Sequence, residues 1–121
     1  MTRDVAEPCI FCDIVAGKIK TEFIYEDDAV VAFPDIRPIA PLHVLVVPRD
    51  HHATLAEVVT TKAGPPLLGR LLKVAGDIGA ARASKDGGYR IVINNGAAAG
   101  QTVYHLHVHV LSGRHFAWPP G

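Results

Sequence analysis

The sequence contains no long apolar run and carries no net charge. No stretch of roughly 18 consecutive apolar residues occurs, so no membrane-spanning helix is expected. Twelve basic side chains balance twelve acidic ones, which argues against extended binding to the phosphate backbone of nucleic acid. Residues 1–8 mix charges of both signs and lack a signal-like apolar segment. These features predict a cytoplasmic protein with no membrane or nucleic-acid partner.

Cysteine is scarce as well, because Cys9 and Cys12 are the only two in the chain. A disulfide is not expected in a protein of cytosolic character, where thiols stay reduced. The C-x-x-C spacing instead favours metal binding or redox chemistry. The alternative is that both thiols are small buried apolar side chains without a chemical role.

The remaining composition is typical of one folded domain. The 121 residues are enough to bury a core, so we expect a single domain over residues 1–121. Runs of β-branched and aromatic residues predict five strands, at 24–25, 30–33, 43–47, 89–94 and 103–111. Apolar residues three and four positions apart predict a long helix from Pro65 to near Ser84, and a shorter helix is expected at 54–60.

Short turns between neighbouring strands favour antiparallel pairing. The predicted fold class is therefore α+β, with a five-stranded, mostly antiparallel sheet, one long helix covering one of its faces, and one short helix. Residues 1–8 are expected to form a flexible N-terminal arm. The tail at 112–121 ends in Trp-Pro-Pro-Gly, which is too apolar and stiff for an idle terminus, so we expect it to pack against another surface such as a second subunit.

The most distinctive pattern is the alternation of histidine with apolar residues between Tyr104 and Val110. On a strand, His105, His107 and His109 share one face, with Cα atoms about 6.5–7 Å apart. The intervening apolar residues take the opposite face, which fixes the register. Three adjacent imidazoles are an unusual choice for a merely solvated face, where lysine, glutamate or threonine would serve. They indicate chemistry that needs a change of charge near neutral pH.

The loop before this strand bears on what the histidines do. Residues 94–102 offer glycines, which allow backbone N–H groups to approach an anion, together with amide and hydroxyl donors. Taken alone, the loop is equally an ordinary connection between strands. A His-x-His pair also suits two zinc ligands. No Asp or Glu lies in this loop or strand, however, and a catalytic zinc usually needs a nearby carboxylate, so phosphate binding is favoured.

The sequence at this point resembles the histidine-triad superfamily, whose signature is His-x-His-x-His followed by apolar residues, here at 105–111. The resemblance is greatest to the histidine-triad nucleotide-binding (Hint) branch and extends over most of the chain. The matching segments are Phe11 to Ile19, Tyr25 to Asp28, Phe33 to Ile36, Val46 to Pro48 with His51, Gly88 to Arg90, Asn94 to Gly96, Gly100 to Tyr104, and Trp118 to Gly121. The resemblance implies a homodimer whose sheets join. It also implies hydrolysis or transfer at nucleoside monophosphate derivatives, such as purine nucleoside phosphoramidates.

The resemblance also implies roles for individual residues. His107 is the nucleophile on the α-phosphorus, giving a nucleotidyl-histidine intermediate. His109 holds the phosphate or leaving group and assists protonation of a departing amine, while His51 and His105 support them, with the neighbouring His52 as an alternative to His51. The implied phosphate contacts are Asn94, Gly100, Gln101 and Thr102, together with His107 and His109. The implied nucleoside contacts are Asp35 at the ribose and Phe11, Ile19, Phe33 and Ile36 in an apolar base slot.

Some members of the superfamily combine an N-terminal C-x-x-C with two such histidines to hold a structural zinc. By this resemblance Cys9, Cys12, His51 and His105 form a tetrahedral Cys₂His₂ set, and no catalytic cofactor is expected. Two rival functions remain open: a zinc-dependent hydrolase that uses the strand histidines as ligands, and a nucleotide-binding interaction protein with vestigial catalysis. His43 and His115 receive no role and are treated as surface or core histidines.

Overall fold

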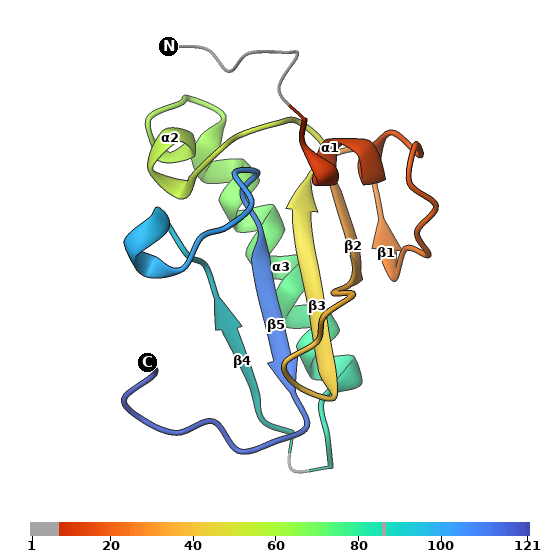
Figure 1. The fold of residues 1–121 in the computed structure, drawn as a ribbon, viewed down its shortest axis with the longest axis vertical. Helices are drawn as coiled ribbons and strands as arrows, with labels where there is room; N and C mark the ends of the chain where they lie inside the picture. Colours follow the sequence, from red (N-terminus) through yellow and green to blue (C-terminus); the bar gives the residue numbers. More distant parts are fainter. Residues whose placement is uncertain (1–7, 86) are drawn as a thin grey trace.

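The computed structural model describes residues 8–85 and 87–121. Its helices are α1 (Ile10–Val15), α2 (Leu55–Val59) and α3 (Gly64–Arg82), with a short 3₁₀ helix, η1 (Ala97–Ala99). Its strands are β1 (Tyr25–Glu26), β2 (Val30–Pro34), β3 (Leu42–Pro48), β4 (Tyr89–Val92) and β5 (Val108–Ser112) (Figure 1). The predicted N-terminal arm lies, except for Pro8, outside the described residues. Along the described ranges, no helix combines the length and apolar character needed to span a membrane.

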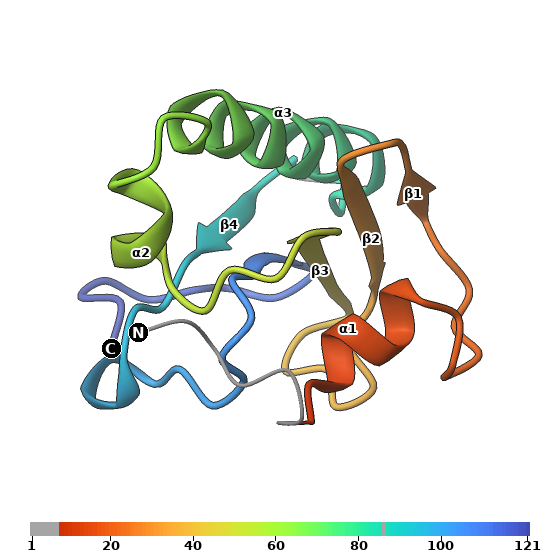
Figure 2. The same cartoon turned by 90° about the horizontal axis from the view of Figure 1, so that it is seen from above.

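The strands form one sheet in the order β1-β2-β3-β5-β4, and every pair of neighbours is antiparallel. Figure 2 shows α3 lying along one face of this sheet and α1 on the opposite face. The α+β class, the antiparallel sheet and the long covering helix are therefore confirmed. The prediction of only two helices was incomplete, because α1 is a third.

Both faces of the sheet carry a hydrophobic core, and β2 contributes to both. Val30 and Ala32 pack in the core beneath α3, which also contains Leu71 of that helix. Val31 and Phe33 point to the other face, where the core includes residues of α1. With neither face in water, β2 is apolar along its length rather than alternating.

Side-chain caps begin the two short helices. Thr54 caps α2, because its Oγ1 accepts a hydrogen bond from the backbone N–H of Glu57 at 3.1 Å. The Glu57 carboxylate reaches back to the backbone N–H of Ala53, the residue before the cap, at 3.2 Å, an arrangement close to the capping box that a Thr-x-x-Glu pattern indicates. Helix α1 begins in a similar way, since the Cys9 Sγ accepts from the backbone N–H of Cys12 at 3.3 Å. The C-x-x-C spacing is thus also that of an N-terminal cap, which explains why α1 was missed from the sequence.

Strand β5 is shorter than expected, because the predicted strand at 103–111 begins at Val108 in the structure. The register pairs Val46 with Val108, and the neighbouring strand β3 ends two residues later at Pro48, which has no N–H to offer a further pairing. The chain before β5 bonds elsewhere instead: the N–H of Leu106 donates to the His52 carbonyl at 2.6 Å. The first two histidines of the row consequently lie on irregular chain.

The C-terminal tail is held where it leaves the sheet. The guanidinium of Arg90 donates to the Ala117 carbonyl at 3.0 Å, and that of Arg114 lies 4.3 Å from the centre of the Phe116 ring. Beyond this point Trp118 is 82% exposed. Within this chain, therefore, the tail packs as far as Phe116 and leaves its indole uncovered.

The turn between β1 and β2 depends on one carboxylate. The Asp27 Oδ1 accepts from the backbone N–H groups of Ala29 and Val30, both at 2.8 Å, while Oδ2 accepts from the hydroxyl of Tyr25 at 2.6 Å and from Arg70 of α3 at 2.9 Å. Burial raises the pKa of Asp27, but these hydrogen bonds outweigh it and hold the pKa far below the ordinary value of 3.8. The carboxylate joins the hairpin to the helix.

We predict that Asp27→Asn lowers the free energy of unfolding by about 1–3 kcal/mol, because an amide cannot accept all of these hydrogen bonds. Asp28→Asn is the matched control, since the Asp28 side chain is 91% exposed and only reaches Arg70 at 3.5 Å. It should cost less than about 0.5 kcal/mol. Urea unfolding measures both, and equal effects would contradict this role for Asp27.

Candidate functional site

The three histidines of the row lie on the face of the sheet opposite α3. The residues between and beside them, Leu106, Val108 and Val110, are all buried in the core under that helix. The predicted alternation is confirmed, and it holds even where the chain has not yet become a strand. His105 is 0% exposed and His107 is 8% exposed, so both rings are shielded from solvent.

One hydrogen bond orients the ring of His107. Its Nδ1 lies 2.8 Å from the backbone carbonyl oxygen of His105, and because a carbonyl can only accept, Nδ1 carries the proton. Burial lowers the pKa of His107, against an opposing effect of this hydrogen bond and of Asp35. In the neutral ring the lone pair is therefore on Nε2.

His109 has the opposite tautomer, and His43 is the reason. The backbone N–H of Ile39 donates to Nδ1 of His43 at 3.1 Å, so neutral His43 carries its proton on Nε2. That Nε2 lies 2.9 Å from Nδ1 of His109 and donates to it, which places the His109 proton on Nε2. Two rings with centres 4.9 Å apart thus present a lone pair from His107 and a donor from His109.

His43 is the functional residue that sequence reasoning missed, since it was treated as a surface or core histidine. It is 6% exposed and comes from β3, where the pairing of Leu45 with His109 sets it diagonally beside that ring. Asp35 completes the group, with Oδ2 3.4 Å from Nε2 of His43. The contact depends on which residues of β3 and β5 pair with each other, whereas the alternation of histidine with apolar residues fixes only the face that each side chain takes.

The environment keeps the imidazoles of His43 and His109 neutral at pH 7. Burial, followed by the neighbouring imidazoles His107 and His43, lowers the pKa of His109 to about 4, with Asp35 opposing. Burial likewise lowers the pKa of His43, again against Asp35. Asp35, His43 and His109 have ligand atoms within 4.8 Å of one another. A cation on Nε2 of His43, however, would force a proton onto Nδ1, where the Ile39 N–H already donates, so the group suits hydrogen bonding rather than metal binding.

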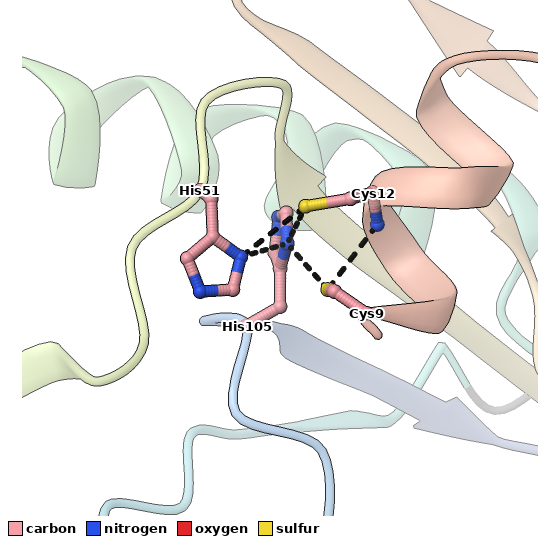
Figure 3. Close-up of side chains that lie close together, drawn as sticks. All are labelled: Cys9, Cys12, His51 and His105. Carbon is pink, nitrogen blue, oxygen red and sulfur yellow. Dashed lines mark hydrogen bonds between the residues drawn. The ribbon is translucent and has the colours of Figure 1, made fainter. Parts of the chain in front are cut away.

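A second cluster lies beside the first and joins both cysteines to two histidines (Figure 3). The Sγ of Cys12 lies 3.2 Å from Nδ1 of His51 and 3.5 Å from Nδ1 of His105, and the Sγ of Cys9 lies 3.4 Å from Nδ1 of His105. The two imidazole nitrogens are 3.2 Å apart. The structure thus brings together the four residues expected to bind zinc, and it places His51 rather than His52 among them.

The donor set fits a tetrahedral metal ion. Bonds of about 2.0 Å to nitrogen and 2.3 Å to sulfur separate neighbouring tetrahedral ligands by about 3.3–3.8 Å, which is close to the distances above. The Nε2 of His105 lies 2.8 Å from the Pro48 carbonyl and donates to it, leaving Nδ1 as a lone pair that faces the cluster. A backbone carbonyl behind a ligating histidine is the usual support of a metal site.

The loop at 94–102 begins beside His109, because Val92 at the end of β4 pairs with that residue. Its shape depends on Gln101, which is 4% exposed. The Gln101 Oε1 accepts from the Gly96 N–H at 2.9 Å, and Nε2 donates to the carbonyls of Ala53 at 2.8 Å and Val103 at 3.1 Å. The side chain of Gln101 therefore joins three segments of the chain.

The expected cradle of backbone N–H groups is only partly present in this loop. Gly96 and Gly100 have φ of 92° and 101°, values that favour glycine. The N–H groups of Ala99 and Gly100 donate to carbonyls of the same loop, at 3.1 and 3.0 Å. The side chains of Asn94 and Thr102, at the two ends of this loop, offer further amide and hydroxyl donors.

The residues expected to bind a nucleoside are divided by the structure. Phe11 and Phe33 are buried, at 6% and 2% exposure, and their rings contact edge to face at 5.6 Å. The Phe11 ring also lies 5.1 Å from that of His107. Ile19 and Ile36 are exposed, at 39% and 86%. The aromatic pair is thus part of the core beside His107, and the two isoleucines lie at the surface.

The site therefore consists of a histidine row with two opposite tautomers, flanked by a Cys/His cluster. The model of the HIT domain family matches residues 16–116, and the chain belongs to this family. The histidine-triad resemblance is thereby confirmed at the level of the family.

Individual relatives agree with this assignment. The chain is 48% identical over 117 residues to an uncharacterised HIT-like protein of Synechococcus elongatus, covering 97% of this chain and 100% of that one. It is 41% identical over 114 residues to a 14 kDa zinc-binding protein of Zea mays, covering 94% of this chain and 88% of the relative. The crystal structure of a HIT family hydrolase from Legionella pneumophila superposes with a TM-score of 0.87 at 41% identity, covering 94% and 100% of the two chains.

The partly buried ring of His109 predicts a pH dependence of stability. Its pKa of about 4 in the folded protein lies below the unfolded value of 6.5, so between these values the unfolded chain binds more protons. The free energy of unfolding should consequently fall as the pH drops from 7 towards 4. His109→Gln should reduce the loss between pH 7 and 5 by about 1–2 kcal/mol in urea unfolding.

His115→Gln is the control, because that side chain is exposed and should leave the pH dependence as it is in the wild type. All proteins are compared at the same metal content. A His109→Gln variant whose stability falls with acid as steeply as that of the wild type would show that His109 is not held neutral in the fold.

Proposed function

We propose that this protein is a nucleotide hydrolase or transferase that acts at the α-phosphorus of nucleoside 5′-phosphoramidates or related nucleoside monophosphate derivatives. The single observation that carries the proposal is the hydrogen bond from Nδ1–H of His107 to the His105 carbonyl, since it leaves Nε2 free as a nucleophile. The name of the Legionella relative, a HIT family hydrolase, supports the reaction class. The matching motifs support assignment of the chain to the Hint branch of the superfamily.

The reaction takes place as two displacements. Nε2 of His107 attacks the α-phosphorus, and the bond to the leaving amine breaks as the nucleotidyl-histidine forms. Nδ1–H of His107 donates to the carbonyl throughout, which stabilises the positive charge that develops on the ring. Water then attacks the same phosphorus and restores His107. No catalytic cofactor takes part.

His109 holds the phosphate or the leaving group through Nε2–H and assists protonation of the departing amine. His43, which donates to Nδ1 of His109, and Asp35 act as the orienting groups behind it. This arrangement assigns His43 a positioning role.

A purine nucleoside monophosphate-type ligand fits the remaining residues. Asn94, Gly100, Gln101 and Thr102 line the phosphate side, where the Gln101 side chain shapes the loop. Asp35 binds the ribose hydroxyls, and its 21% exposed side chain is accessible from the surface. The proposed base slot consists of Phe11, Ile19, Phe33 and Ile36, because an apolar slot accepts a planar ring. Ile19 and Ile36 offer exposed apolar surface to the base, and the buried Phe11 and Phe33 pack behind it.

We also propose that Cys9, Cys12, His51 and His105 hold a structural zinc. Their convergence supports this, as does the name of the maize relative, a zinc-binding protein. Zinc would supply four bonds that join α1, the segment after β3 and the segment before β5. Thiols that must remain reduced to bind metal agree with a cytoplasmic location.

A homodimer is proposed on the geometry of the sheet edge and the tail. Strand β4 is an edge strand of the sheet, and an edge offers unpaired backbone groups to a second copy. The 82% exposed indole of Trp118 lies on the tail at 112–121, which is next to β4 through Arg90. Pairing of two β4 strands would join the sheets and bring each tail towards the partner.

We predict a covalent adduct on His107. During turnover of an adenosine phosphoramidate, acid-free quenching and mass spectrometry should detect an added adenylyl group on the peptide that contains His107. His107→Asn should lose both adduct and turnover, because an amide nitrogen is not a nucleophile, while His115→Gln keeps both. Turnover that persists in His107→Asn would contradict the mechanism, and binding of the nucleotide without turnover in the wild type would indicate an interaction protein.

Zinc content is predicted to depend on His51 and not on its neighbour. Purified wild-type protein should contain a stoichiometric zinc ion by elemental analysis, and His51→Gln should lose it because a ligand is removed. His52→Gln is the matched control, because His52 lies outside the Cys/His cluster and accepts from Leu106 through its backbone carbonyl, and it should retain the metal. Equal zinc content in both variants would contradict the Cys₂His₂ site.

A further inference from the structure

The Cys/His cluster and the nucleophile share one residue, His105. The side chain of His105 belongs to the cluster, with Nδ1 3.4 Å from the Cys9 Sγ and 3.2 Å from Nδ1 of His51. The carbonyl of the same residue accepts the 2.8 Å hydrogen bond from Nδ1–H of His107. Whatever fixes the ring of His105 therefore also restrains the peptide group that selects the His107 tautomer.

A second connection runs through helix α1. Phe11 lies between the two cysteines in sequence. The centre of its ring lies 5.1 Å from that of His107 and 5.9 Å from that of His105, in both cases edge to face. Fixing the two thiols therefore fixes the ring that packs against the nucleophile. The helix has only six residues, and a helix of this length has no stability of its own. Its position depends on what it contacts.

The core beneath α3 does not depend on this cluster, although Cys9 belongs to the core on the other face of the sheet. The core beneath α3 contains Leu71, Val108 and Val110, all 0% exposed, and none of the four cluster residues. Burial of that core stabilises the sheet and α3 whether or not the thiols are bridged. Loss of a metal from the cluster would consequently loosen α1 and the segment before β5 while the domain stays folded.

We propose that the Cys/His cluster, when it holds zinc, acts as a positioning site for the nucleophile: it fixes the His105 peptide and Phe11 so that His107 is held as one tautomer in one orientation. This inference rests on the proposed function for its catalytic consequence. Cys9, Cys12 and His51 are then positioning residues, although none of them touches the substrate. A metal that only added global stability would leave the ring of His107 unchanged in a folded protein.

The test compares four forms of the full chain: zinc-loaded wild type, chelator-stripped wild type, Cys12→Ser, and Ile14→Val. The last is the matched control, because Ile14 lies in α1, is 8% exposed and is not a ligand. Its substitution weakens the packing of α1, by about 1 kcal/mol, without removing a donor. Circular dichroism establishes that every form compared is folded.

The first readout is the ¹⁵N spectrum of the histidine rings, which distinguishes a protonated from an unprotonated ring nitrogen. In the zinc-loaded protein and in Ile14→Val, His107 should give one tautomer, protonated at Nδ1. In the stripped protein and in Cys12→Ser it should give averaged or doubled signals, and added zinc should restore the single tautomer only in the stripped wild type. This readout needs no substrate and remains decisive if the proposed reaction fails.

The second readout is the single-turnover rate of adduct formation on His107 with an adenosine phosphoramidate. Stripping of zinc should lower this rate by about tenfold or more, because misplacement of a reacting group is costly, while Ile14→Val changes it less than about threefold. A single Nδ1–H tautomer that persists in the folded, zinc-free protein would overturn the inference, and so would a wild-type protein that binds no zinc. A loaded protein with the expected tautomer but no adduct would refute only the proposed reaction.

Discussion

The hydrogen bond between Nδ1–H of His107 and the His105 carbonyl is the interaction on which the site depends. It decides which nitrogen of a buried imidazole carries the proton, and burial keeps that ring neutral at pH 7. A parallel chain from the Ile39 N–H through His43 assigns the other tautomer to His109. Two neighbouring histidines of the same row thus present a lone pair on one ring and a hydrogen-bond donor on the other. The difference arises because Nδ1 of His107 faces an acceptor, the His105 carbonyl, whereas Nδ1 of His109 faces a donor, Nε2–H of His43.

The fold directs the histidine rings towards these groups because the apolar residues that alternate with them are held in the core beneath α3. Leu106, Val108 and Val110 are buried under α3, and a shift of the register by one residue would exchange them with the histidines. The end of β3 matters equally. The β3–β5 pairing ends at Val46 and Val108, two residues before Pro48, so the segment before β5 leaves the ladder, and Nε2 of His105 can donate to the Pro48 carbonyl. An irregular segment beside a regular strand therefore allows one histidine to join the cysteines while the next two remain available for chemistry.

Much of this could be predicted from the sequence, and the reasons for the misses are physical. Periodicity identified α3, the strands and the common face of the histidines, because these depend on local spacing. Helix α1 was missed because its cap is a cysteine, which is not among the usual capping residues. His43 was missed because its partner is 66 residues away and the contact depends on strand register. The contacts of the Gln101 amide with Gly96, Ala53 and Val103 were not predicted either, because no sequence pattern reveals them.

The central claim is the assignment of opposite tautomers to His107 and His109. Neutron diffraction from a deuterium-exchanged crystal near pH 7 tests it most directly, because it locates ring protons by observation. The account predicts deuterium on Nδ1 of His107, directed at the His105 carbonyl, and on Nε2 of His109, with Nδ1 of His109 bare. Deuterium on Nε2 of His107 in the neutral ring would contradict it, since the nitrogen assigned to attack phosphorus would then have no lone pair.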